Sequence, residues 1–207
     1  MSRSARIEGA NLKDIEKCLE FIIEAEKLKN VLRRTKAIGT DRYENSAEHS
    51  WQLALLAIVL AKYSNKPIDI GRVVMMLIVH DLGEIDADDV FFFDEGRADA
   101  KEKERAGIER LCTLLPAEAA DLVRGNWLEF EDGDSTEAKF ARAVDRVMPI
   151  LQNLSNGRQS WIENGVSREQ ILAKTAYIAD GSGAVWEIIA ERINLAFEAD
   201  GVSRDFD

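Results

Sequence analysis

The spacing of apolar residues near the start of the chain predicts a helix followed by a polar loop. Asn11 is a good N-cap residue, and the helix after it should continue to about Arg33 or Arg34. The apolar residues that recur at helical intervals in this stretch are Ile15, Leu19, Ile22, Leu28, Val31 and Leu32. Residues 36–45 are polar and contain a glycine, so we expect a loop there.

Two further helices are predicted to form the buried centre of the protein. Ser46 can cap a helix that reaches about Tyr63, and residues 53–61 within it are apolar on nearly every face, as in a central helix. Asp69 can cap the next helix, which is apolar all round over residues 73–79 and should stop near Gly83.

The rest of the chain predicts an irregular segment and then more helices. Residues 84–94 are acidic and end near Phe91, Phe92 and Phe93, a triplet more typical of core packing or a subunit interface than of a substrate lid. A charged helix should run to about residue 115 and another should start at Pro116. Capping-box patterns at 134–137 and 167–170 predict two more helix starts, and Ser182 can begin a last helix that ends near residue 201. No alternating strand pattern stands out, so the expected fold is all-α, with residues 1–207 as one domain.

Composition narrows the possible partners. The 27 basic and 38 acidic residues give a net charge of −11, which disfavours nucleic acid and anionic membranes but allows a small anionic substrate where a few cations converge. The longest apolar run, 53–61, is too short to span a membrane. Residues 1–13 lack the apolar segment of a signal peptide, and Cys18 and Cys112 do not form a disulfide pattern. We therefore expect a cytoplasmic protein.

The only two histidines lie in the two most apolar helices. His49 is one turn before Leu53, and His80 extends the stripe that contains Val73 and Met76, so both imidazoles should point into the core. A neutral imidazole is the commonest metal ligand, although either histidine alone is more often a hydrogen-bonded core residue.

Two aspartates are candidates to join them. Asp81 follows His80 directly, and neighbouring helical residues face different ways, so both side chains can face one metal only if the helix ends there. The alternative is that Asp81 caps or solvates the following loop. Asp145 borders an apolar stripe next to Pro149, which should kink its helix, and the alternative is a surface ion pair with Arg142 or Arg146.

The order and flanks of these residues resemble a known superfamily. The segments Ala47-Glu-His49-Ser, His80-Asp81-Leu-Gly-Glu84 and Ala143-Val-Asp145-Arg are similar to those of HD-domain metal-dependent phosphohydrolases, and most similar to the 5′-deoxynucleotidase-like group. The resemblance implies a helical bundle, often homodimeric, in which one divalent metal is bound. The residues that match the family's metal ligands are His49, His80, Asp81 and Asp145.

The resemblance also implies roles for three other residues. Glu84 matches the group that orients or activates the attacking water, Asp89 matches an acidic residue near the substrate, and Arg33 matches a phosphate-contacting arginine at the end of the first helix. Two departures leave the substrate open. Arg34, followed by threonine and lysine, stands where many relatives have an aromatic residue, and Asp88 stands where relatives often have glycine, which adds a negative charge near an anion site.

These features favour a phosphohydrolase that acts on (deoxy)nucleoside monophosphates or a similar small phosphate ester. One divalent ion (Mn, Co, Fe, Zn or Ni) would polarise the phosphoryl group, with Glu84 as base and Arg33 as phosphate clamp. One alternative is a nucleotide-binding metal protein without turnover. Another is a (p)ppGpp-type hydrolase. Such an enzyme normally has two adjacent acidic residues right after the HD helix, whereas in this chain Glu84 is followed by Ile85. Two-metal HD enzymes need further histidines, which this chain lacks.

Overall fold

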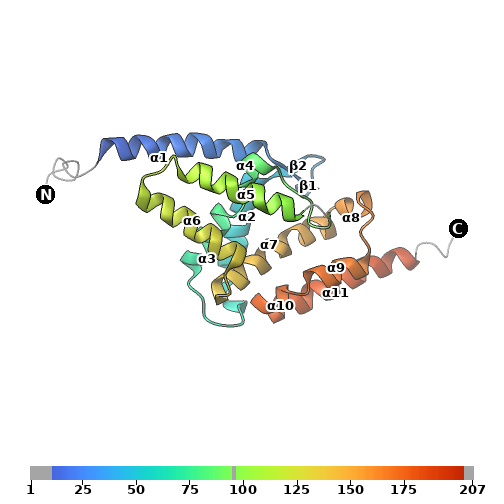
Figure 1. Ribbon diagram of the computed structural model, residues 1–207. Helices are drawn as coiled ribbons and strands as arrows, with labels where there is room; N and C mark the ends of the chain where they lie inside the picture. Colours follow the sequence, from blue (N-terminus) through green and yellow to red (C-terminus); the bar gives the residue numbers. More distant parts are fainter. Residues whose placement is uncertain (1–10, 95–96, 203–207) are drawn as a thin grey trace.

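The computed structural model describes residues 11–94 and 97–202, and helices make up most of them, as predicted (Figure 1). The long helices are α1 (Leu12–Ala25), α2 (Ser46–Leu60), α3 (Ile70–Val79), α5 (Arg97–Cys112), α6 (Ala117–Asp132), α7 (Thr136–Ser155) and α11 (Gly183–Val202). Shorter ones are α4 (Glu84–Ala87), α8 (Gln159–Glu163), α9 (Arg168–Thr175) and α10 (Ile178–Gly181), with 3-10 turns η2 (Glu26–Asn30) and η3 (Ala61–Tyr63). One small antiparallel sheet pairs β1 (Leu32–Lys36) with β2 (Tyr43–Asn45).

The N-terminal segment differs from its prediction. Asn11 caps α1 as expected, but the helix ends at Ala25, and residues 32–45 form a β-hairpin rather than the end of a helix and a loop. Leu28 lies in the 3-10 turn η2 and Val31 directly follows it, and both side chains are buried. Their spacing therefore reflects core packing and not a continued helix. Residues 32–36 form a strand because they pair with residues 43–45, and the apolar spacing within either segment does not show this pairing.

The caps of the predicted helices agree with the sequence except at two positions, whereas the short helices α4, α8 and α10 were not predicted, and α4 lies in the segment expected to be irregular. Asp69 caps α3 and Ser167 forms a capping box at α9, as predicted. At α2 the cap is Asn45, which forms a capping box with Glu48, and the predicted cap Ser46 is instead the first helical residue. At α7 the cap is Ser135 rather than the preceding aspartate.

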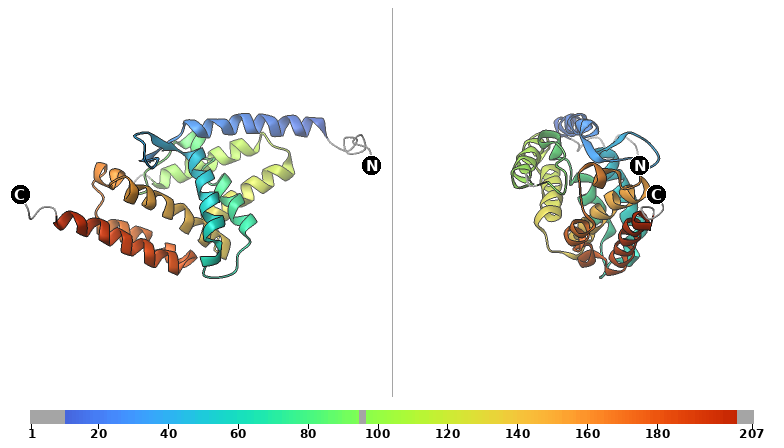
Figure 2. Two further views of the ribbon diagram at one scale, coloured as in Figure 1. Left: turned by 180° about the vertical axis from the view of Figure 1, so that it is seen from behind. Right: turned by 90° about the vertical axis from the view of Figure 1, so that its right-hand side faces the viewer.

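Helices α2, α3 and α7 meet at the centre of the bundle. Their buried residues form one apolar cluster, which includes Leu53, Val73, Met76, Ala141 and Val144. Figures 1 and 2 show α1 along one side of the bundle, projecting beyond it at its N-terminal end, and α9 to α11 along the opposite side. None of the helices in residues 11–94 and 97–202 combines the length and apolar character needed to cross a bilayer.

Two close backbone approaches hold the elements around this centre. A Cβ atom at Gly181 in α10 would lie 2.5 Å from the carbonyl oxygen of Lys139, so glycine lets α10 pack tightly on α7. A Cβ atom at Gly83 would lie 2.5 Å from the carbonyl oxygen of Glu104. The turn between α3 and α4 therefore rests directly on α5.

Asp88 ends α4 in a strained backbone conformation. Its φ of 61° and ψ of 162° lie in a region that is almost restricted to glycine. Such a conformation costs about 1–3 kcal/mol in a residue with a side chain.

We expect the substitution Asp88→Gly to raise the free energy of unfolding by about 1 kcal/mol, because relief of strain exceeds the extra chain entropy that glycine adds to the unfolded state. Urea denaturation would measure this change. Asp41→Gly is the control: Asp41 is also an exposed loop aspartate but has no positive φ, so glycine there should lower stability. Equal changes at both positions would show that Asp88 is not strained.

Candidate metal centre

The two histidines and the first aspartate of the predicted set lie together in the interior. His49 comes from α2, His80 ends α3, and Asp81 lies in the turn that follows. One ligand atom from each lies within 4.8 Å of the others, and all three residues are buried. Asp145 from α7 joins them, with Oδ1 at 3.1 Å from His49 Nε2 and 3.8 Å from His80 Nε2. The structure thus brings together the four side chains that the resemblance singled out.

The hydrogen bonds of His80 determine which of its nitrogens is available. Nδ1 lies 2.8 Å from the carbonyl oxygen of Leu77 and must donate to it, which leaves Nε2 without a proton in the neutral ring. Nε2 is buried and has no hydrogen-bond partner in the described part of the chain, although Asp81 Oδ1 is only 3.0 Å away. Burial lowers the pKa of His80, but the charges of Asp81 and Asp145 raise it above its usual value. A cation is therefore favoured beside this nitrogen.

The donor set fits a divalent metal. Two imidazoles and two carboxylates from separate elements converge at a buried point, and nitrogen and oxygen donors of this kind suit first-row transition metals. A buried imidazole nitrogen facing carboxylates without a proton or metal between them is costly. The geometry therefore supports the prediction of one divalent ion, whose identity the donors do not determine.

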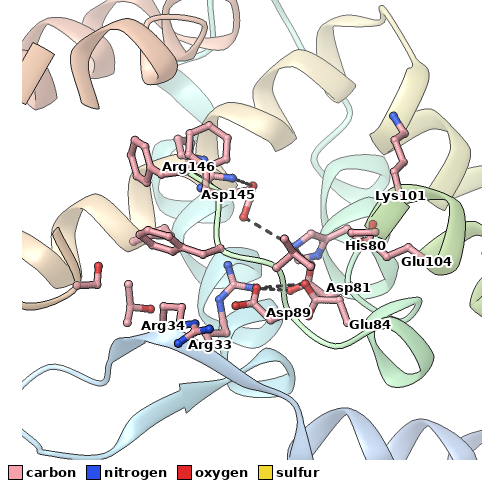
Figure 3. A pocket seen from close by; sticks show the side chains of 18 of the residues that line it. Arg33, Arg34, His80, Asp81, Glu84, Asp89, Lys101, Glu104, Asp145 and Arg146 are labelled. Carbon is pink, nitrogen blue, oxygen red and sulfur yellow. Dashed lines mark hydrogen bonds and ion pairs between the residues drawn. The ribbon is translucent and has the colours of Figure 1, made fainter. Parts of the chain in front are cut away.

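Arg33 lies among carboxylates beside this cluster (Figure 3). Its Nη1 is 3.0 Å from Asp81 Oδ2, 3.5 Å from Asp89 Oδ1 and 3.9 Å from Glu84 Oε1, and its Nε is 3.7 Å from Glu44 Oε2. Burial works against the charged guanidinium, but the carboxylates, with Asp81 foremost, raise its pKa further above the usual value. Arg33 therefore stays a buried cation. It projects from β1, not from the end of the first helix as the resemblance implied.

The aspartates of the cluster are held in the charged form. Burial raises the pKa of Asp81, but the charges of His80 and Arg33 outweigh it and bring the value to about 2. Burial likewise raises the pKa of Asp145, while the charge of Arg146 and a hydrogen bond with His49 lower it below its usual range. Both carboxylates are thus ionised at neutral pH, as metal ligands must be.

The pKa values of Glu84 and Asp89 are shifted in the opposite direction, upward. Burial and the negative charge of Asp81 raise the pKa of Glu84 well above its usual value, and burial also raises that of Asp89. Ser46 Oγ donates to Glu84 Oε2 at 2.6 Å, which fixes the carboxyl group. Glu84 is therefore a buried, oriented carboxyl whose raised pKa makes it a stronger proton acceptor than an ordinary glutamate, as suits a general base.

A cavity of about 420 Å³ borders the cluster, and its walls include Arg33, His80, Asp81, Glu84, Asp89 and Asp145. Among its other walls are Arg34, Thr35, Lys101 and the phenylalanines 91–93, and of the three phenylalanines Phe91 and Phe93 also pack in an apolar core cluster. In a regular strand, Arg33 and Arg34 would point to opposite faces. Here Leu32 pairs with Asn45 and Lys36 with Tyr43, so β1 contains two more residues than β2 in the paired stretch, and this irregularity lets both arginines reach the cavity.

Asp88 does not contribute the negative charge that we expected near the anion site. It is exposed and is not among the cavity residues, while Asp89 is. Its positive φ is a conformation that glycine adopts readily, which agrees with the glycine that the resemblance implies at this position. The carboxylate of Asp88 is therefore not part of the cavity wall.

Two side chains at the site, Glu44 and Arg146, were not predicted as site residues. Glu44 is 1% exposed, with Oε2 at 3.3 Å from His49 Nδ1, and its Oε1 accepts a hydrogen bond from Gln152 Nε2 at 2.6 Å. Its place depends on the hairpin, for which the sequence carried no signal. Arg146 pairs with Asp145, as the alternative of an ion pair predicted, but it is buried in the cavity wall and does not lie on the surface.

Comparisons with known proteins agree with this geometry. The family model described as "HD domain" matches residues 25–186. Among curated proteins, the 5′-deoxynucleotidase HDDC2 of Dictyostelium discoideum is 28% identical over 76% of this chain and 87% of its own length, and that of Xenopus laevis is 27% identical over 64% and 68%. A crystal structure of a predicted metal-dependent phosphohydrolase from Magnetospirillum magnetotacticum is 36% identical, with a TM-score of 0.86 over 90% of this chain and 94% of that one. The chain belongs to the HD-domain family.

Proposed function

We propose that this chain is a divalent-metal-dependent phosphohydrolase of the 5′-nucleotidase type, which acts on (deoxy)nucleoside monophosphates or a similarly small phosphate ester. The observation that carries the proposal is the buried cluster of two imidazoles and two carboxylates that borders a cavity containing Arg33 and Glu84. The names of the relatives support the same reaction class.

His49, His80, Asp81 and Asp145 would hold the metal. When bound, a divalent ion supplies a Lewis acid for the phosphoryl group and lowers the pKa of coordinated water. Mn, Co, Fe, Zn and Ni all suit the donor set. Glu44 Oε2 lies 3.3 Å from His49 Nδ1, on the far side of the ring from Asp145, and this contact keeps His49 Nε2 directed toward Asp145.

The protein's own groups bind the substrate and move the proton. Arg33 offers a forked pair of donors to phosphate oxygens, and Asp89 and Glu44 keep the guanidinium oriented toward the cavity. Glu84 Oε2 is held by Ser46, so the carboxylate can accept a proton from a water molecule near Asp81. The placement of Glu84 inside the cavity favours turnover over a binding protein that holds metal without catalysis.

We also propose that the chain works as a homodimer in the cytoplasm. Large apolar side chains are exposed in rows on α1 and α2, among them Leu19, Ile22, Trp51 and Leu55. Such a surface favours burial against a second copy. Cys18 and Cys112 are free, which is consistent with a reducing compartment.

Light scattering of the purified chain should give about twice the mass of 23.2 kDa calculated for one copy. A double substitution of exposed apolar residues on α2, Trp51→Glu and Leu55→Glu, should shift the protein to the monomer, because it places charges in the proposed interface. A monomeric wild-type protein would contradict the proposed dimer.

Asp81→Asn should weaken divalent-metal affinity by at least about 100-fold, because the amide is nearly isosteric but lacks the charge that the metal needs. Competition with a chromophoric chelator on metal-stripped protein would measure the dissociation constant. Asp121→Asn is the control, since Asp121 is exposed on α6 and pairs with Arg124. If both variants bound metal equally well, the cluster would not be the metal site.

Glu84→Gln should keep the metal but lower kcat for nucleoside monophosphates by about 10²–10⁴, the usual contribution of a general base. Phosphate release from nucleoside mono-, di- and triphosphates by the metal-loaded protein is the assay, with exposed Glu118→Gln as the control. If neither the wild type nor the control variant released phosphate, the phosphohydrolase proposal would be refuted. Equal rates in wild type and Glu84→Gln would refute the role of Glu84.

A further inference from the structure

Arg146 is held rigidly in the cavity wall. It follows Asp145 on α7, and its Nη2 donates to Asp145 Oδ2 at 3.2 Å. Its Nε donates to the hydroxyl oxygen of Tyr177 at 3.1 Å, and the guanidinium carbon lies 3.5 Å from the centre of the Phe92 ring. Two hydrogen bonds and one stacking contact therefore fix the plane of the guanidinium before any ligand arrives.

The remaining nitrogen of this guanidinium is open. Nη1 makes no hydrogen bond to any residue of the described ranges, and it is not one of the side-chain atoms sealed from solvent. Arg146 lines the cavity and only 12% of its side chain is exposed, so a group bound in the cavity is the partner within reach of this donor. A guanidinium buried to this degree gains most from an anionic partner.

Arg146 and Arg33 lie on two sides of the same space. Figure 3 shows Arg146 next to Asp145 and Arg33 next to Asp81, with His80 between the two pairs. Burial lowers the pKa of Arg146 and the charge of Arg33 lowers it further, while Tyr177 and Asp145 raise it above its usual value. The two cations thus act across one cavity, and each is paired with an aspartate of the metal cluster.

We propose that Arg146 is a second phosphate-binding residue, which donates from Nη1 to a nonbridging phosphate oxygen on the side opposite Arg33, so that the two arginines select dianionic phosphate monoesters over monoanionic diesters. This inference rests on the proposed function. A monoester dianion offers three charged, nonbridging oxygens, enough for both arginines and the metal cluster, whereas a diester offers two oxygens and one charge. Phe92 then has a role in the cavity, because it holds the plane of Arg146.

The first test measures binding of inorganic phosphate to the manganese-loaded protein by calorimetry. Arg146→Gln should bind phosphate about 10-fold to 100-fold more weakly, the range expected when one charge-assisted hydrogen bond is lost. Its metal affinity should not fall, because the substitution removes a cation beside Asp145. A purely structural role would weaken metal binding along with phosphate binding.

Arg142→Gln is the matched control. Arg142 is one turn earlier on α7 and donates to the carbonyl oxygens of Phe130 and Gly133, but it does not line the cavity. Its substitution removes the same charge and two structural hydrogen bonds, so the thermal midpoint should fall while phosphate affinity stays within about 2-fold of wild type. An equal loss of phosphate affinity in both variants would overturn the proposal, as would unchanged affinity in Arg146→Gln.

The second test compares kcat/KM for a nucleoside 5′-monophosphate with that for bis(p-nitrophenyl) phosphate. Arg146→Gln should reduce the monoester preference by about 10-fold, and an unchanged preference would overturn the proposed selectivity. If Arg146→Gln does not fold, Arg146→Lys decides the matter, because it keeps the charge but cannot reproduce the fixed planar donor and should weaken phosphate binding by at least 3-fold. If wild type binds phosphate but hydrolyses no ester, the proposed function fails, and the binding result still decides the role of Arg146.

Discussion

The pairing of one buried guanidinium with several buried carboxylates is the constraint on which the site depends. Asp81, Glu84, Asp89 and Glu44 come from different elements, and their charges would be costly in the interior without Arg33 among them. The hairpin must therefore dock against the turn after α3, and α4 must begin where it does. The same arrangement leaves both histidine rings facing Asp145 across a space that fits a metal. Stability and chemistry thus depend on the same set of charges.

The parts of the fold that follow from local rules were predicted well. The apolar faces of α2 and α3 and the caps at Asn11, Asp69 and Ser167 are visible in the sequence, because period and side-chain chemistry determine them locally. The hairpin was not predicted. Leu28 and Val31 continue the apolar spacing of α1, although the chain has already left the helix, and only pairing with residues 43–45 makes residues 32–36 a strand.

The residues of the site likewise fall into those that sequence motifs predict and those that depend on the tertiary fold. Recognisable motifs led to His49, His80, Asp81 and Asp145, and the structure brings these side chains together. Glu44 could not be predicted, because its contact with His49 requires the hairpin register. The burial of Arg146 could not be predicted either, since it requires Phe92, which arrives from a loop 54 positions earlier in the chain. Motifs indicate the ligands of a site, whereas the residues that surround them depend on tertiary packing.

The irregular pairing of β1 has a consequence for how this protein can change over evolutionary time. Arg33 is tied into the buried charge network, so almost any replacement would disturb the interior. Its neighbour Arg34 also reaches the cavity, yet it is exposed, and no ion pair to it exists among residues 11–94 and 97–202. A mutation at Arg34 would therefore alter what the cavity accepts at little cost to stability. The irregular pairing therefore places Arg33, which the charge network requires, next to Arg34, which can be replaced. Substitutions at Arg34 can change the substrate preference while the metal centre stays intact.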